Sequence, residues 1–212
     1  MNRSTSHHEG LSRLCFFVDV QGYGARSLPD QERVQGWLVE ALERMRANVP
    51  LEEGQLTRQN QGDGCLLLVD PGVPVPVVLP RLVQGIGEAV RWVNEPLRES
   101  ARIKVRAAFD VGVVRTAVNG YVGRAVTSVS RLVDSAPLRA QLTASSASSV
   151  AVALSDSLYQ DVVATGLPGL PPESFEQIPV EVKEFATWAW LMAQGPAGEN
   201  AGRQGAHGSL ER

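Results

Sequence analysis

The short turn "QGDG" at residues 61–64 constrains the fold of this chain more than any other feature of the sequence. It joins two extended runs, one near residues 55–59 and the apolar "CLLLV" at residues 65–69. Gly and Asp between two such runs are a strong signal for a β-hairpin. The two strands are therefore predicted to pair antiparallel, with Asp63 in the turn that joins them.

A buried strand at residues 14–20, "LCFFVDV", and a helix at residues 29–48 precede this hairpin. A strand–helix–strand crossover makes the first and second strands parallel. If one strand position between them stays open, the third strand fills it antiparallel, which is the split βαβ arrangement. The end of the first strand and the hairpin turn then lie at one edge of the sheet, so Asp19 and Asp63 are predicted neighbours.

The rest of the chain continues the alternation of helix and strand. The segment "PGVPVPVVLP" at 71–80 is predicted to be a loop, because its prolines cannot serve a central strand. Apolar spacing then predicts a helix at 80–100, a strand at 102–114, a turn at 119–123, a helix at 125–136, a strand at 149–154, a short helix at 156–163, and strands at 175–183 and 186–192. We expect one α+β domain with a ferredoxin-like βαββαβ core, built as an α/β sandwich.

Composition bounds the class of protein. The chain has 212 residues, is 43% hydrophobic and carries a net charge of −3, which is typical of one soluble domain and argues against a broad nucleic-acid or membrane surface. The domain is expected at residues 13–193, with disordered tails at 1–12 and 194–212, which are rich in polar residues and Gly. There is no apolar run of about 20 residues and no secretory signal, so we expect a cytoplasmic protein.

The cysteines and histidines exclude some chemistries. Cys15 and Cys65 each begin an apolar run and are expected to be buried free thiols, too far apart along antiparallel strands to bridge. All three histidines lie in the expected tails. A metal site or catalytic centre built on histidine is therefore not expected.

The two aspartates carry the first functional hypothesis. Two neighbouring carboxylates repel, and one takes up a proton unless a cation joins them. Mg²⁺ is held by one or two carboxylates together with phosphate oxygens. The alternative is that Asp63 is only a turn residue and Asp19 only ends a strand.

Five stretches in this order resemble the class III nucleotidyl cyclase homology domain: "FFVDVQGYG", "QGDGCLLLV", "VRAAFDVGVV", "GYVGRAVTSVSRLV" and "VEVK". The resemblance spans about residues 14–192. It implies the cyclase version of the ferredoxin-like fold, in a homodimer with active sites at its interface. It also implies that Asp19 and Asp63 bind two Mg²⁺ or Mn²⁺ ions and that Arg106 contacts phosphate.

The resemblance assigns the other half of each site to the second subunit. Arg131 matches an arginine that stabilises the transition state, and Lys183, in "VKE", matches a phosphate-binding lysine. Four positions depart from the family pattern, one of them Asp110, which stands where the family's strand motif has a histidine. Gln59 and Gly120 stand where the purine base is read, and Thr127 stands where an asparagine orients the ribose. The metal and phosphate half is thus whole, while the base-reading half is altered.

The residues themselves allow these roles and also plainer ones. Thr127 and Arg131 are four residues apart, so they share one helical face. A surface arginine, a cross-strand ion pair and a simple surface charge are the plainer interpretations of Arg131, Arg106 and Lys183, respectively. The turn Gly22, Tyr23 and Gly24 offers backbone N–H groups that could cradle phosphate, or is an ordinary turn.

The resemblance predicts a metal-dependent enzyme that converts a nucleoside triphosphate to a 3′,5′-cyclic nucleotide and pyrophosphate, with atypical base recognition. Two alternatives stay open: a weak or inactive nucleotide-binding or regulatory module of the same fold, and a pyrimidine cyclase (UTP or CTP) of the kind used in phage defence. No sensor domain is evident, so control is expected to come from a separate regulatory protein or from substrate supply.

Overall fold

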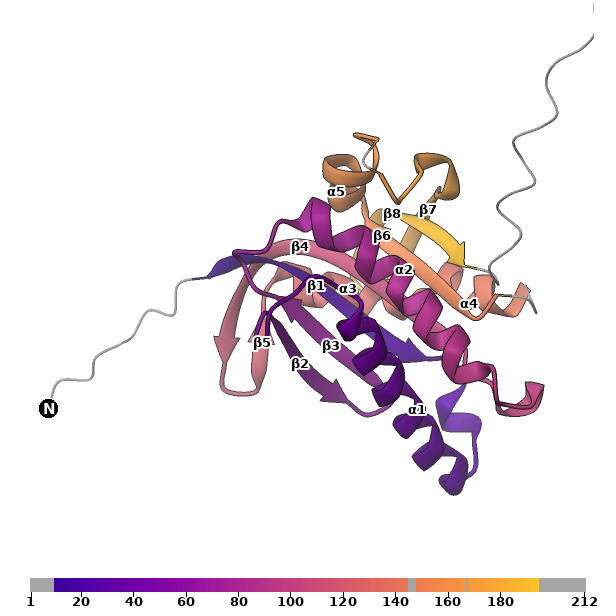
Figure 1. The fold of residues 1–212 in the computed structure, drawn as a ribbon. Helices are drawn as coiled ribbons and strands as arrows, with labels where there is room; N and C mark the ends of the chain where they lie inside the picture. Colours follow the sequence, from indigo (N-terminus) through magenta and orange to yellow (C-terminus); the bar gives the residue numbers. More distant parts are fainter. Residues whose placement is uncertain (1–9, 145–147, 167, 195–212) are drawn as a thin grey trace, which may run out of the picture.

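The computed structural model describes residues 10–144, 148–166 and 168–194 and centres on one mixed β-sheet (Figure 1). Along the sheet the strands follow the order β2-β3-β1-β4-β6-β8-β7, and β5 pairs with β4. The strands are β1 (Leu11–Val20), β2 (Leu56–Gln61), β3 (Gly64–Val69), β4 (Val105–Ala117), β5 (Gly120–Val122), β6 (Val150–Ser155), β7 (Glu176–Val182) and β8 (Phe185–Gln194). The longer helices are α1 (Leu28–Ala47), α2 (Val75–Asn94), α3 (Arg124–Val133) and α4 (Ala136–Ala144).

The predicted hairpin and crossover are confirmed. Strand β3 lies between β1 and β2 and runs antiparallel to both, so β1 and β2 are parallel. Asp19 pairs with Gly64, and Gln61 pairs with the same Gly64 from the other side, which leaves a two-residue turn of Gly62 and Asp63. A Cβ atom on Gly64 would lie 2.4 Å from the Phe17 ring, so any side chain at residue 64 would have to displace that ring.

Helices cover both faces of the sheet, which gives the predicted sandwich (Figure 1). On one face α1 and α2 bury a core that includes the stacked rings of Phe16 and Phe109. On the other face α3 and α4 pack on alternate strand residues such as Phe17 and Ala108. Asp19 and Arg106 continue this second alternation, so their side chains face the side of α3.

The predicted loop at residues 71–80 is wrong, because α2 begins at Val75. Pro76 lies in the first turn, where no N–H bond is required, while Pro80 removes one bond inside the helix. The fully buried Val78 and Leu79 lie between them in the core. Packing of this apolar face thus overrides the prolines, and the helix ends at Asn94 rather than near residue 100.

Other boundaries differ from the predictions. The helix predicted at 125–136 is α3, which ends at Val133, and the second helix α4 was not expected. Gly120–Val122, predicted as part of a turn, forms the short strand β5, and the short helix predicted at 156–163 consists of α5 (Asp156–Leu158) and a π-helical turn (Tyr159–Val163). Strand β1 begins at Leu11, so the sheet includes two residues assigned to the N-terminal tail.

The expected tails otherwise lie largely outside the described residues, although Gln194 still pairs with Val150 at the end of β8. Cys15 and Cys65 are buried free thiols, as predicted, and lie opposite Leu68 and Val18 in the β1–β3 pair. Among the described residues, no helix is long and apolar enough to cross a bilayer.

Candidate functional site

Asp19 and Asp63 converge where β1 ends, as the topology predicts. Asp63 is in the hairpin turn, and its backbone oxygen accepts a hydrogen bond from Val20 N–H at 3.3 Å. The negative charge of Asp63 acts on the carboxyl group of Asp19. On the other side of β1, Arg106 is the register partner of Asp19, and its Nη2 donates to Asp19 Oδ2. A cross-strand ion pair, one of the two interpretations of Arg106, is therefore present.

The guanidinium of Arg106 is buried but only partly bonded. The residue is 7% exposed, and neither Nε nor Nη1 has a hydrogen-bond partner among the described residues. A guanidinium carries five N–H donors, and buried donors without acceptors are unfavourable. The unbonded nitrogens of this side chain are therefore suited to receive a further acceptor, such as a phosphate oxygen.

The same surroundings shift the protonation of Asp19. Burial raises the pKa of Asp19 most, the Arg106 guanidinium lowers it, and the carboxylates of Asp63 and Asp134 raise it again, which leaves the pKa at about 6. A carboxylate that is hard to ionise in the free protein gains from a bound cation. The electrostatics of this site thus favour a positive ligand beside Asp19.

A third acidic residue, Asp134, completes this cluster and was missed in the sequence. It directly follows α3, and its Oδ1 lies 3.9 Å from Arg106 Nη1 and also pairs with Nη2 of Arg139 in α4. A signal was available, because a carboxylate at the C-terminal end of a helix opposes the helix dipole. Such a residue is expected to have a nearby cation.

The glycine turn after β1 adopts a tight backbone. Gly22 has a φ of +74°, a conformation that favours glycine, and a 3₁₀ turn (Tyr23–Ala25) follows. The hydroxyl of Tyr23 accepts a hydrogen bond from Gln35 Nε2 at 2.8 Å, which fixes the turn to α1. Gly24 is exposed, so the turn lies at the surface beside the end of β1.

Gln59 and Gly120, the two positions that depart from the purine-reading pattern, touch each other. The carboxamide of Gln59 donates from Nε2 to Asn119 O at 3.4 Å, while its Oε1 is buried without a partner among the described residues. A Cβ atom on Gly120 would lie 2.4–2.7 Å from the end of this side chain, and the φ of Gly120 is +110°. The two residues therefore form one unit, in which a larger residue at 120 requires Gln59 to move.

Thr127 and Arg131 share the face of α3 that is turned away from the core. Thr127 is exposed and its hydroxyl donates to Gly123 O at 3.3 Å, whereas Val129 and Val133 are buried. Arg131 is half-buried and makes no hydrogen bond or ion pair with the described residues. Its guanidinium is thus available to an outside anion.

Lys183 lies far from Asp19 within one chain. It is exposed, has a φ of +55° and belongs to the turn between β7 and β8. Residues 151 and 193 pair at the end of the sheet where Arg106 lies, while Phe185 extends past Ser155 at the opposite end. One chain therefore does not bring Lys183 to the aspartate pair.

The donor set at the aspartate pair fits a metal that is completed by substrate. Among the described residues there is no group of three or more His, Cys, Asp or Glu side chains that could hold a metal by themselves. Two carboxylates are available, and Mg²⁺ commonly uses one or two together with phosphate oxygens and water. Asp19 and Asp63 therefore fit a metal–triphosphate complex rather than a permanent metal centre.

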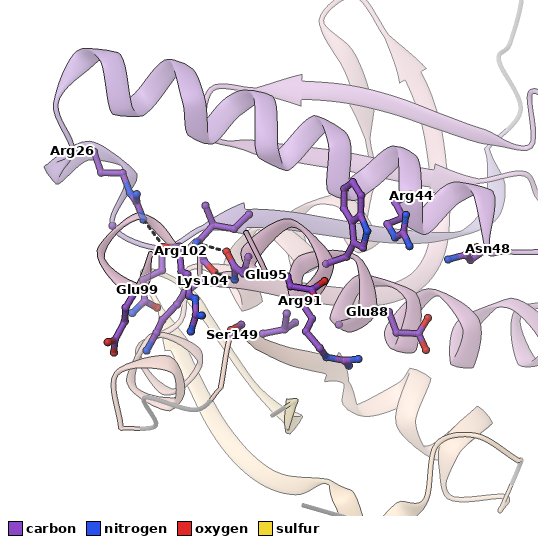
Figure 2. Close-up of a pocket in the computed structure, with 17 residues that line it drawn as sticks. Arg26, Arg44, Asn48, Glu88, Arg91, Glu95, Glu99, Arg102, Lys104 and Ser149 are labelled. Atoms are coloured by element: carbon purple, nitrogen blue, oxygen red, sulfur yellow. Dashed lines mark hydrogen bonds between the residues drawn. The ribbon is translucent and has the colours of Figure 1, made fainter. Parts of the chain in front are cut away.

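A separate groove of about 1050 Å³ lies beside α2, on the face opposite α3, and includes Gln21 and Gly22 at its edge (Figure 2). Figure 2 shows Arg26 reaching to Arg102, whose backbone oxygen accepts its hydrogen bond at 3.1 Å. The arginine and lysine side chains that line this groove lie among three glutamates, Glu88, Glu95 and Glu99. Asp19 and Arg106 do not line it, so it is distinct from the candidate site.

Comparisons with known proteins agree with the fold. No protein-family model matches the sequence, and no curated protein matches it. Among solved structures, the adenylate/guanylate cyclase/hydrolase from Silicibacter pomeroyi is 21% identical, with a TM-score of 0.60, and the match covers 87% of this chain and 99% of that chain. The guanylate cyclase domain of RhGC from Catenaria anguillulae, in complex with GTP, is 15% identical, with a TM-score of 0.55 and coverage of 89% and 97%.

The catalytic core of a rhodopsin-guanylyl cyclase with converted specificity, in complex with ATPalphaS, is also similar, at 17% identity and a TM-score of 0.56 over 88% of this chain and 97% of that chain. Each of these structural matches covers most of this chain and most of the matched chain. The chain therefore has the fold of class III nucleotidyl cyclase domains, as the resemblance in sequence implied.

Proposed function

We propose that this chain is a metal-dependent nucleotidyl cyclase that works as a homodimer. The observation that carries the proposal is the buried Arg106, with unbonded nitrogens, beside the convergent carboxylates of Asp19 and Asp63. The cyclase fold adds support, since its solved relatives include domains in complex with GTP or ATPalphaS.

In the proposed reaction the ribose 3′-hydroxyl oxygen attacks the α-phosphorus of a nucleoside triphosphate. The new O3′–P bond replaces the bond from phosphorus to the bridging oxygen of pyrophosphate, and the hydroxyl proton leaves to solvent. Bound Mg²⁺ or Mn²⁺ would lower the pKa of the 3′-hydroxyl and offset phosphate charge. The carboxylates of Asp19 and Asp63 would hold that ion, and Arg106 would donate to the leaving phosphates.

The partner subunit would supply the remaining groups. Arg131 would stabilise charge at the α-phosphate, Lys183 would bind the phosphates, and Thr127 would orient the ribose through its single hydroxyl. Lys183 lies at the opposite end of the sheet from Arg106 within one chain, so only a second copy could bring it to the aspartates. The backbone of Gly22, Tyr23 and Gly24 would contact the phosphates from the first subunit.

A pyrimidine triphosphate (UTP or CTP) is the second candidate substrate. Gln59 and Gly120 touch, and this leaves no side chain at 120 to read a purine together with residue 59. A carboxamide can both donate and accept, which suits either pyrimidine edge. A nucleotide-binding module without turnover is the third candidate, because Thr127 has one donor in place of the two of an asparagine.

The test is incubation with all four ribonucleoside triphosphates and Mn²⁺, with products identified by mass spectrometry. We expect a 3′,5′-cyclic nucleotide and pyrophosphate from wild type and neither from Asp63→Asn, which keeps the hairpin turn but removes a metal ligand. Triphosphate binding by calorimetry that is unchanged in both Asp19→Asn and Asp63→Asn would overturn the site assignment. Triphosphate binding without product formation would favour the third candidate, a nucleotide-binding module without turnover.

A further inference from the structure

The buried Arg106 lies between two carboxylates that belong to different elements. Asp19 is on β1 and accepts a hydrogen bond from Nη2, while Asp134 follows α3 and lies 3.9 Å from Nη1. At that distance Asp134 and Arg106 form an ion pair but no hydrogen bond. The guanidinium is therefore bonded to one carboxylate and placed next to another.

Asp134 also pairs with a second arginine, Arg139. Its Oδ1 pairs with Arg139 Nη2, and both of these side chains are about half exposed, whereas those of Arg106 and Asp19 are 9% and 12% exposed. Exposed ion pairs contribute little, but a buried guanidinium that loses its carboxylate is strongly destabilised. Arg106 therefore has more to gain from Asp134 than Arg139 has.

We infer that Asp134 is a positioning residue: when a cation binds Asp19, Asp134 pairs with Arg106 in place of Asp19. The inference rests on the proposed function, because it concerns the metal–triphosphate site. A cation on Asp19 competes with the guanidinium for the same carboxylate oxygens. Asp134 supplies a second carboxylate only a small side-chain movement away, so the guanidinium stays paired and points its free nitrogens to the phosphates. Arg139 opposes this exchange, because it competes for Asp134.

The first experiment reads the exchange without any ligand. Urea unfolding at pH 8 is compared for wild type, Asp19→Asn, Asp134→Asn and the double variant. When Asp19 is replaced, Asp134 is the one carboxylate among the described residues that still pairs with Arg106. Asp134→Asn should therefore lower the folding equilibrium constant about tenfold more in the Asp19→Asn background than in wild type. Equal losses in both backgrounds would overturn the inference, whether or not the protein binds nucleotide.

Asp30→Asn is the matched control. Asp30 on α1 is about half exposed, and its side-chain partners are Arg33, at 2.8 Å, and Ser27 rather than Arg106, so this variant removes the same charge elsewhere. Its effect on unfolding should be equal in both backgrounds. A background-dependent effect of Asp30→Asn would show that the cycle reports net charge rather than the exchange.

The second experiment measures calorimetric affinity for Mn²⁺ with a non-hydrolysable triphosphate. Asp134→Asn should weaken binding about tenfold, because Arg106 then holds Asp19 against the metal. Arg139→Gln should tighten binding about two- to fivefold, since Asp134 is released to Arg106. If Asp134 merely links α3 to α4, both variants should change the affinity in the same direction or not at all, which would overturn the inference. Absence of binding in wild type would count against the proposed function alone, because the unfolding cycle still decides the exchange.

Discussion

The two halves of the candidate site differ in how the chain holds them. Asp19 and Arg106 are buried, paired across adjacent strands and charge-coupled to Asp63 and Asp134. Arg131 and Lys183 are half-buried and exposed, respectively, and have no polar side-chain partner within the described part of the chain. The first half is thus held in place by contacts within one chain, whereas the charged groups of Arg131 and Lys183 have no such contacts.

This difference predicts whether a variant should change folding, binding or both. Changes in the first half should alter folding as well as binding, because buried charges depend on their partners. Changes in the second half should leave folding intact and alter only binding or chemistry. The following predictions test this contrast, beginning with the largest expected effect.

Arg106→Met should destabilise the fold by about 3–5 kcal/mol, because it leaves the buried Asp19 carboxylate without its cation. Urea unfolding measures the loss, and Arg33→Met, in the exposed pair with Asp30, is the control, with an expected loss below about 1 kcal/mol. Arg131→Met should also change stability little. Equal losses for Arg106→Met and Arg131→Met would remove the contrast between the two halves.

The stability of the free protein should depend on the protonation of Asp19. Burial raises its pKa from 3.8 to about 6, so between these values the native state holds a proton that the unfolded chain has released. The contribution of Asp19 to the free energy of unfolding therefore falls as the pH rises from about 4 to about 6, by about 2–3 kcal/mol, and is constant above.

Urea unfolding at pH 4, 5, 6 and 7 checks this slope, with Asp19→Asn as the comparison. The difference in unfolding free energy between the two proteins should shift with pH in favour of the variant and level off above pH 6. A difference that is constant from pH 4 to 7 would mean that the carboxyl group titrates at its ordinary pKa.

Mixing two defective subunits should restore activity if the halves meet across a dimer. Asp63→Asn removes a proposed metal ligand, and Arg131→Ala removes the arginine proposed to stabilise the transition state, so each alone should form little product. A mixed dimer holds one site with both defects and one intact site, so random exchange should return about a quarter of wild-type turnover. Pyrophosphate release measures it. No recovery, with dimers present by light scattering, would place both halves in one chain.

The sequence predicts the first half of the site well because local rules determine it. A Gly-Asp turn dictates the hairpin, the crossover leaves one strand position open, and the convergence of Asp19 and Asp63 follows from these two facts. The free cysteines follow from the same register. The predicted cyclase version of the fold is likewise confirmed.

The features that the sequence does not predict depend on contacts between elements that are distant in the chain. Helix α2 passes through Pro80 because Val78 and Leu79 are buried against the sheet, which no local propensity reveals. Asp134 reaches Arg106 only after α3 has packed across β4. The contact between Gln59 and Gly120 joins β2 to the β4–β5 turn, so it depends on how far that hairpin curls over the sheet.

The smallest effect is expected from restoring the purine-type residues, Gln59→Lys with Gly120→Asp and Thr127→Asn. The φ of Gly120 is +110°, where Asp is strained, and a Cβ atom there would meet the side chain of residue 59. Lysine at 59 is longer than glutamine, so it must leave the buried position of the carboxamide. Thr127→Asn alone fits, because residue 127 is exposed on α3.

The triple variant should therefore show little or no gain in ATP or GTP cyclisation, while Thr127→Asn alone should leave stability nearly unchanged. Mass spectrometry of the cyclic products measures the first, and urea unfolding the second. Random loss of activity would not be expected to spare Asp19, Asp63 and Arg106 while altering all three positions of the base and ribose half. A rise of several orders of magnitude in cyclic purine nucleotide would instead mark the chain as a purine cyclase impaired at these three positions, and the contact of Gln59 with Gly120 would then be its consequence.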